Sequence, residues 1–181
     1  MDSIPPNAPY IKPDPALVSQ WHRTLDHDNN FKIGVVWAGN PKNKNDHKRS
    51  CSLKDFEHLT SIRELSFYSL QKGQASVEAN NPPKGMNIIN LDNELNDFAD
   101  TAAAIINLDL VISVDTSVAH LAGAIGKPVW TLLPSVPDWR WLLERNDSPW
   151  YPSMRLFRQT QLYDWDGVFE QVKKALIQKI T

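Results

Sequence analysis

The sequence is poor in the features that mark disulfide-stabilised, secreted and membrane-spanning proteins. Its one cysteine, Cys51, cannot form a disulfide within the chain and supplies no metal-ligand spacing, so we expect a reducing compartment. No apolar run approaches the roughly 18 residues that a membrane helix needs, and residues 1–15 lack the charged start and apolar core of a signal peptide. These absences favour a cytoplasmic protein without a membrane span.

An excess of charge of either sign is also lacking. Lys and Arg total 19 and Asp and Glu total 21, which gives a net charge of −2. Such a chain has no overall attraction for nucleic acid or for an anionic membrane surface, so any basic site must be local. With 41% hydrophobic and 22% charged residues over 181 positions, the composition is that of one ordinary globular domain.

Prolines are concentrated near the N-terminus, at positions 5, 6, 9, 13 and 15. This density favours extended backbone. Asp14 before Pro15 is typical of a helix start, and Leu17 and Trp21 continue a helical pattern to about residue 26. We therefore divide the chain into residues 1–30, a linker with one short helix, and residues 31–181, the main domain.

Within the main domain, strand and helix patterns alternate. Apolar runs predict strands at 33–37, 65–70, 86–91, 110–114, 129–133 and, more weakly, 154–157. Helical patterns occupy 52–59, 97–108, 117–125, 139–145 and 165–179. The alternation predicts an α/β fold, a Rossmann-like and mainly parallel sheet with helices on both faces. Ligands of such sheets bind beyond the carboxyl ends of the strands, which draws attention to the loops after Trp37 and Val114.

The loop after Trp37 is locally basic. Residues 38–50 carry four basic side chains against one acidic residue, Asp46. Gly39 would let the backbone approach an anion closely, and Arg49 has the fork of donors that binds phosphate. A solvated surface loop would explain the same charges equally well. The Gly-x-x-x-x-Gly-Lys-Ser/Thr pattern of a P-loop is absent.

The loop after Val114 leads from a strand straight into a helix. The first free N–H groups of that helix, at residues 116–118, and its dipole would attract a phosphate, and Thr116 could add a hydroxyl donor. His120 lies one turn beyond Thr116 on the same helix face. The alternative is that Asp115 or Thr116 is only a helix cap and His120 a packed, hydrogen-bonded residue.

Other aromatic and reactive residues are less informative. Three tryptophans within residues 137–151 could stack on a nucleobase, or they could clamp the last helices on the sheet. We expect Cys51 to be a small buried residue rather than a nucleophile. Gly-x-Ser-x-Gly, Gly-x-Gly-x-x-Gly and His-x-x-x-His are absent, which disfavours a hydrolase, a dinucleotide oxidoreductase and a metal site. We therefore expect no cofactor and no metal.

Taken together, residues 35–41, 109–128, 138–141 and 147–158 strongly resemble the C-terminal nucleotide-sugar-binding domain of GT-B glycosyltransferases. They look most like the family 9, heptosyltransferase-like domains found at the end of bacterial tetratricopeptide-repeat proteins. The most specific part is Asp-Thr-x-x-x-His at 115–120, followed by Gly-x-Pro at 126–128. The resemblance implies the C-terminal half of a GT-B fold and hexosyl or heptosyl transfer.

The same resemblance implies how a donor would be held. By position, the phosphate candidates are Gly39, Arg49, Thr116 and Ser117, with Asp115 orienting the turn and His120 beside it. Residues 70–72 are a weaker candidate for the base side of the crevice. No catalytic residue is assigned, since family members usually carry the catalytic base on the N-terminal domain.

Two hypotheses follow. In the first, the chain is the donor-binding domain of a glycosyltransferase; it binds a nucleotide sugar or nucleoside diphosphate, is incomplete without an acceptor domain and is inactive in isolation. In the second, it is a non-catalytic Rossmann-like module that binds a protein partner. In either case a homodimer could cover the face where the acceptor domain would sit.

Overall fold

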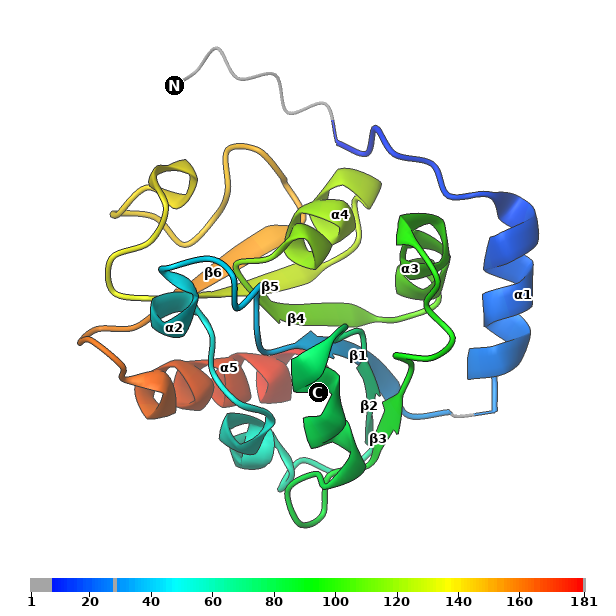
Figure 1. The fold of residues 1–181 in the computed structure, drawn as a ribbon, viewed down its shortest axis with the longest axis horizontal. Coiled ribbons are helices and arrows are strands. Elements are labelled where there is room, and N and C mark those ends of the chain that lie inside the picture. The colour runs from blue at the N-terminus through cyan, green and yellow to red at the C-terminus, as the bar shows by residue number, and fades with distance from the viewer. Residues whose placement is uncertain (1–7, 28, 181) are drawn as a thin grey trace.

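The computed structural model describes residues 8–27 and 29–180, and its centre is one parallel sheet (Figure 1). The sheet is 6-stranded with the order β3-β2-β1-β4-β5-β6, and every neighbouring pair is parallel. The strands are β1 (Phe31–Val36), β2 (Leu65–Ser69), β3 (Ile88–Asn90), β4 (Leu110–Val114), β5 (Val129–Leu133) and β6 (Met154–Arg158). The predicted α/β, Rossmann-like fold is therefore confirmed.

Helices cover both faces of this sheet (Figure 1). On one face lie α1 (Pro15–Leu25), α3 (Phe98–Ile106) and α4 (Ser117–Ile125). The other face is covered by α5 (Trp165–Ile180) and the 3-10 helix η1 (Leu53–Leu59). Two further 3-10 helices, η2 (Gln74–Asn80) and η3 (Trp139–Trp141), and the short helix α2 (Asp46–Arg49) lie in the connections.

The hydrophobic core has two halves, one on each side of the sheet. All residues of β2, β4 and β5 are buried, because both faces of the sheet are covered. Along β1, Ile33 and Val35 face the α5 side, whereas Val36 faces the α3 side. Phe56 of η1 packs edge-on against Phe169 of α5 at 4.7 Å between ring centroids. The uninterrupted apolar runs of the sequence thus reflect strands that are buried on both faces.

The strand order reverses between β1 and β4, which are neighbours in the sheet but far apart in the chain. Val36 is aligned with Ser113, so the two strands end at the same level. The loops that follow Trp37 and Val114 consequently lie together at one edge of the sheet. This is the position at which open α/β sheets bind ligands.

Several local expectations need correction. The predicted helix at 139–145 stops at residue 141, because Leu142 adopts a left-handed backbone with φ of 53°. The helix predicted after Ser52 forms at Leu53–Leu59 with Ser52 as its cap but is a 3-10 helix, and Gln74–Asn80, for which no helix was expected, form another. The basic loop contains α2. Asp14 caps α1 as predicted, accepting from the Ala16 N–H at 2.8 Å.

Only part of the predicted linker falls within the described structure. Residues 1–7 and 28 lie outside the described residues. Residues 8–14 are extended, and the N–H groups of Tyr10 and Ile11 donate to the main-chain oxygen of Ala124 at 2.9 and 3.2 Å. The described part of this segment therefore runs along the C-terminal end of α4.

Candidate functional site

A cleft of about 1210 Å³ opens at the carboxyl ends of β1, β2 and β4. Its walls come from the loops after these strands, from η2 and from the first turns of α3 and α4. All six site residues named from the sequence line it: Gly39, Arg49, Asp115, Thr116, Ser117 and His120.

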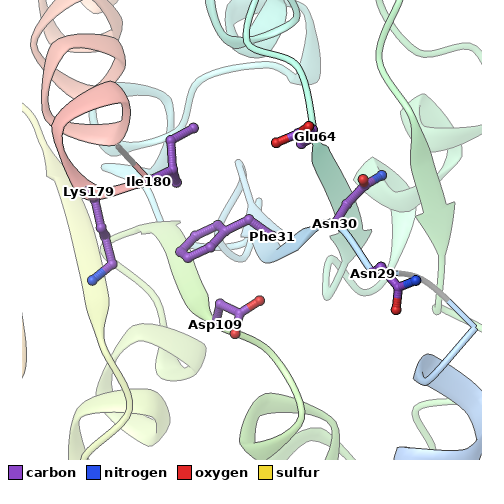
Figure 2. A pocket seen from close by; sticks show the side chains of 7 residues that line it. All are labelled: Asn29, Asn30, Phe31, Glu64, Asp109, Lys179 and Ile180. Carbon is purple, nitrogen blue, oxygen red and sulfur yellow. The ribbon is translucent and has the colours of Figure 1, made fainter.

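A second cavity of about 640 Å³ lies at the opposite end of the sheet, where the strands begin. Figure 2 shows it between Phe31 of β1, Glu64 before β2, Asp109 before β4 and the end of α5. The Asp109 carboxylate accepts from the Lys32 N–H at 2.7 Å, so this side chain serves the sheet itself. The sequence-predicted residues belong to the larger cleft at the carboxyl edge.

Arg49 joins the two loops of the cleft. Its Nε donates to Oδ1 of Asp46 at 3.0 Å, and its Nη1 donates to the main-chain oxygen of Asp115 at 2.9 Å. Within the described part of the chain, no hydrogen bond engages its third nitrogen, Nη2. The guanidinium is thus fixed in direction by two hydrogen bonds.

Gly39 makes room for this arginine. A Cβ at Gly39 would lie 2.2 Å from Oδ1 of Asp46 and 2.6 Å from Nη2 of Arg49. Its N–H donates to the Ser50 hydroxyl at 2.9 Å, and that hydroxyl donates to Oδ2 of Asp46 at 3.0 Å. The structural reason for glycine is therefore the packing of the Asp46–Arg49 ion pair against the loop.

The start of α4 presents free backbone donors to the cleft. Thr116 is the N-cap residue, but its side chain does not cap the helix. The Ser113 hydroxyl donates its one proton to the Val114 oxygen at 2.7 Å, so the Thr116 hydroxyl, 2.9 Å from it, must be the donor of their shared bond. Among the residues that the structure describes, no hydrogen bond is recorded for the N–H groups of Ser117 and Val118, as is usual in the first turn of a helix.

His120 is both packed and open to the cleft. Its ring stacks on Trp141 at 5.0 Å between centroids, and its Nδ1 is 3.1 Å from the hydroxyl of Tyr151. Its Nε2 is 3.8 Å from Oδ1 of Asp115. Burial lowers the pKa of His120, and the nearby Asp115 carboxylate offsets part of that effect. The packed, hydrogen-bonded histidine expected as the alternative is therefore found, and the same residue also lines the cleft.

Gln71, in the weaker candidate segment 70–72, holds a central position at the floor of the cleft. This buried side chain accepts from the N–H groups of Trp37 and Ala38 at 3.1 and 2.9 Å and donates to the Ala38 oxygen at 3.0 Å. Lys72 pairs with Asp92 at 3.0 Å. Gln71 thus holds the end of β1 in place. The available signal was an amide directly after the predicted strand at 65–70.

The cleft has an apolar side that sequence reasoning missed. Val77 of η2 and Phe98 of α3 line it, and their exposed fractions are 62% and 61%. Large apolar side chains left this open beside a polar cleft are available to cover a flat ring. The two lie in sequence segments without any recognisable motif, so only the fold brings them together.

Within the aromatic block the structure confirms a packing role for Trp141, while the stacking of a tryptophan on a nucleobase stays a prediction. Trp141 is buried beneath His120, as expected of a packing residue. Trp139 is exposed and Arg140 lies over its ring at 5.1 Å, while Trp150 Nε1 donates to the Arg140 oxygen at 2.9 Å.

Cys51 is half-buried, and burial together with the carboxylate of Asp55 raises the pKa of its thiol well above the ordinary value. This shift disfavours the reactive thiolate. Within residues 8–27 and 29–180, no three His, Cys, Asp or Glu side chains group as metal ligands would. None of the described helices has the length and apolar character to cross a membrane.

Comparison with known proteins identifies a family whose model matches this chain. The model of "Glycosyltransferase family 9 (heptosyltransferase)" matches residues 68–162. "Protein FlbA" of Caulobacter vibrioides is 27% identical over 183 residues, covering 97% of this chain and 30% of FlbA. The chain thus spans about a third of this relative.

Solved structures share the fold. The ADP-heptose LPS heptosyltransferase II of E. coli is 13% identical with a TM-score of 0.66, covering 94% of this chain and 54% of that enzyme. A family 9 glycosyl transferase from Veillonella parvula is 14% identical with a TM-score of 0.65, and the match covers 93% of this chain and 52% of that protein. E. coli heptosyltransferase WaaC, solved with ADP-2-deoxy-2-fluoro heptose, is 15% identical with a TM-score of 0.55, and the match covers 95% of this chain and 49% of WaaC. The chain spans about half of each.

Proposed function

The chain belongs to glycosyltransferase family 9, and on that premise we propose that it is a donor-binding domain that holds a nucleotide sugar or nucleoside diphosphate in the carboxyl-edge cleft. The observation that carries this proposal is the bond between Arg49 Nη1 and the Asp115 oxygen at 2.9 Å. It brings a guanidinium from one loop beside the free N–H groups of α4 from the other.

These two groups suit a diphosphate. The N-terminus of α4 offers directed N–H donors and a partial positive charge, and Nη2 of Arg49 adds a full charge with a fixed direction. When the sugar leaves, negative charge grows on the diphosphate, and donors that are already in position stabilise it without further reorganisation. This arrangement needs no metal ion for leaving-group stabilisation.

The apolar side of the cleft suits the nucleoside. A base that lies against Val77 and Phe98 would cover two of the most exposed large apolar side chains beside the cleft. Adenine is the base we propose, because two E. coli relatives with this fold are described with ADP-heptose or ADP in their names. Within the candidate segment 70–72, the amide of Gln71 is already engaged, so the exposed Lys72 is the candidate for the edge of the base.

Sugar transfer needs parts beyond this domain in our proposal. The chain spans 54% of heptosyltransferase II and 49% of WaaC. We propose that the acceptor and the catalytic base belong to another domain or subunit, so that the isolated domain binds the donor without transferring the sugar. An association with tetratricopeptide repeats and a homodimer stay predictions of the sequence resemblance.

A second candidate function rests on a different observation. Val136, Trp139 and Leu143 are exposed by 80%, 68% and 70% and follow one another closely in the chain. Where such exposed apolar side chains form one patch, that patch is typical of a protein-binding surface. A non-catalytic family member would use this surface for a protein partner and leave the cleft empty.

Calorimetric titration with ADP, UDP and GDP tests the proposal. We expect ADP to bind best and Arg49→Ala to weaken it by about tenfold, the value of one charge-assisted hydrogen bond. Lys48→Ala is the matched control, because Lys48 is the exposed neighbour of Arg49 with the same charge. The double variant Asp46→Asn/Arg49→Ala separates loss of the guanidinium from the effect of leaving Asp46 unpaired. Absence of binding by all three nucleotides would favour the protein-binding alternative.

A further inference from the structure

The environment of His120 is unsymmetrical between its two ring nitrogens. Nδ1 points away from the cleft to the hydroxyl of the buried Tyr151, at 3.1 Å. Nε2 lies 3.8 Å from the Asp115 carboxylate, too far for a hydrogen bond between them. Asp115 lines the cleft together with His120, whereas Tyr151 is not among the lining residues, so Nε2 is the ring nitrogen on the cleft side.

This asymmetry selects one position for the ring proton. A neutral imidazole carries one proton, and its bare nitrogen bears a lone pair. A lone pair on Nε2 would face the negative Asp115 carboxylate, whereas an N–H there is attracted to it. Nδ1 is then the bare nitrogen and must accept from Tyr151. Burial and the neighbouring Tyr10 raise the pKa of Tyr151, which keeps its hydroxyl protonated and able to donate.

Burial of the His120 ring, and not the charges around it, favours the neutral form. Asp115 and Asp138 would stabilise the imidazolium, whereas Arg140 and the burial of the ring oppose it, and burial is the largest of these effects. The pKa of His120 is consequently lowered below its ordinary value. At neutral pH the ring is therefore a neutral donor or acceptor, and its tautomer decides which.

We propose that Tyr151 is a positioning residue for His120: its hydroxyl donates to Nδ1 and, together with the Asp115 carboxylate, holds the ring as the Nε2–H tautomer. This rests on the proposed function in one respect, the role of the Nε2–H group, which donates to the diphosphate of the bound nucleotide. With the opposite tautomer, the bare Nε2 would repel the phosphate oxygens. Tyr151 thus determines whether His120 Nε2 attracts or repels the phosphate oxygens, although Tyr151 itself does not contact the ligand.

Nitrogen NMR of the whole chain, labelled at its histidines, tests the tautomer without any ligand. Protonated and bare imidazole nitrogens resonate far apart, and we expect a protonated Nε2 and a bare Nδ1 at His120. Tyr151→Phe should give a mixture of both tautomers, and Asp115→Asn should shift the equilibrium toward Nδ1–H. Tyr163→Phe, at an exposed tyrosine, is the matched control and should leave the His120 signals unchanged. A protonated Nδ1 in the unmodified chain, or an unaltered tautomer in Tyr151→Phe, would overturn the proposal.

Titration with ADP tests the role of the Nε2–H group. Tyr151→Phe should weaken ADP binding by about threefold to tenfold, because the Nε2–H tautomer is no longer held and the hydrogen bond from Nε2 to the diphosphate is weakened. Equal affinity of Tyr151→Phe and the unmodified chain would overturn the donation to the diphosphate. If ADP, UDP and GDP all fail to bind the unmodified chain, the proposed function fails, and with it the role toward a diphosphate. The NMR result on the tautomer is independent of that outcome.

Discussion

Gly123 of α4 and Tyr151 are in direct contact: a Cβ on Gly123 would lie only 2.5 Å from Cγ of Tyr151. Gly123 lies within a regular helix, so the backbone does not require glycine at this position. Glycine is required there because its missing Cβ leaves space for the tyrosine ring. The same ring carries the hydroxyl that reaches His120. The packing of one residue pair therefore sets the geometry of a cleft side chain one helical turn away.

Gly123→Ala should for this reason destabilise the protein. An alanine normally gains about 1 kcal/mol over glycine in a helix, but here the new methyl group displaces a buried ring at a typical cost of about 1–3 kcal/mol. We expect a net loss of unfolding free energy, measured by urea denaturation, together with a change in the His120 nitrogen signals. A stability gain with unaltered His120 signals would contradict the contact.

The backbone donors at the start of α4 can be removed singly. Ser117 is the first residue of the helix, where proline is tolerated, and the preceding Thr116 is already extended with φ −139° and ψ 168°. Ser117→Pro should therefore keep the helix while deleting one N–H, and ADP affinity should fall about tenfold. Ser117→Ala keeps the N–H and serves as the control. Equal ADP affinity of the two variants, by calorimetry, would exclude this N–H as a phosphate ligand.

The buried His120 predicts a pH dependence of stability. Its folded-state pKa lies below the unfolded value of about 6.5, so the unfolded chain binds the proton more readily. The neutral His120 ring therefore contributes its full share to the free energy of unfolding above the unfolded-state pKa. This contribution is lost as the pH falls through the folded-state pKa of His120. His120→Gln should show a flatter fall of unfolding free energy than the unmodified chain between about pH 7 and 5. His22→Gln, at an exposed histidine, should parallel the unmodified chain.

Gln71 should be essential for the floor of the cleft. Gln71→Ala leaves the N–H groups of Trp37 and Ala38 without their acceptor in a buried site, at a cost of about 2 kcal/mol or more. We expect a lower denaturation midpoint and weaker ADP binding, because the loop that carries Arg49 starts here. The control is Gln20→Ala, an exposed glutamine of α1 that does not line the cleft. Equal stability of the two variants would show that β1 holds its end without Gln71.

Much of the fold and the place of the site were predictable because they depend on local pattern. Alternating apolar and amphipathic segments specify strands and helices, and parallel strands with crossover helices specify which loops share an edge. The predicted strand at 110–114, followed by Asp-Thr-x-x-x-His, appears as β4 and the start of α4. The resemblance to family 9 was confirmed by the match over residues 68–162.

By itself the sequence thus determined the α/β class, the two loops of the cleft and the family. Only the tertiary structure decided what individual side chains do. The bond from Arg49 to Asp115 joins residues 66 positions apart, and that from Gln71 to Trp37 spans 34. The physical reason is that residue type fixes which bonds a side chain can make, whereas its actual partner depends on which distant segment the fold brings within about 3 Å.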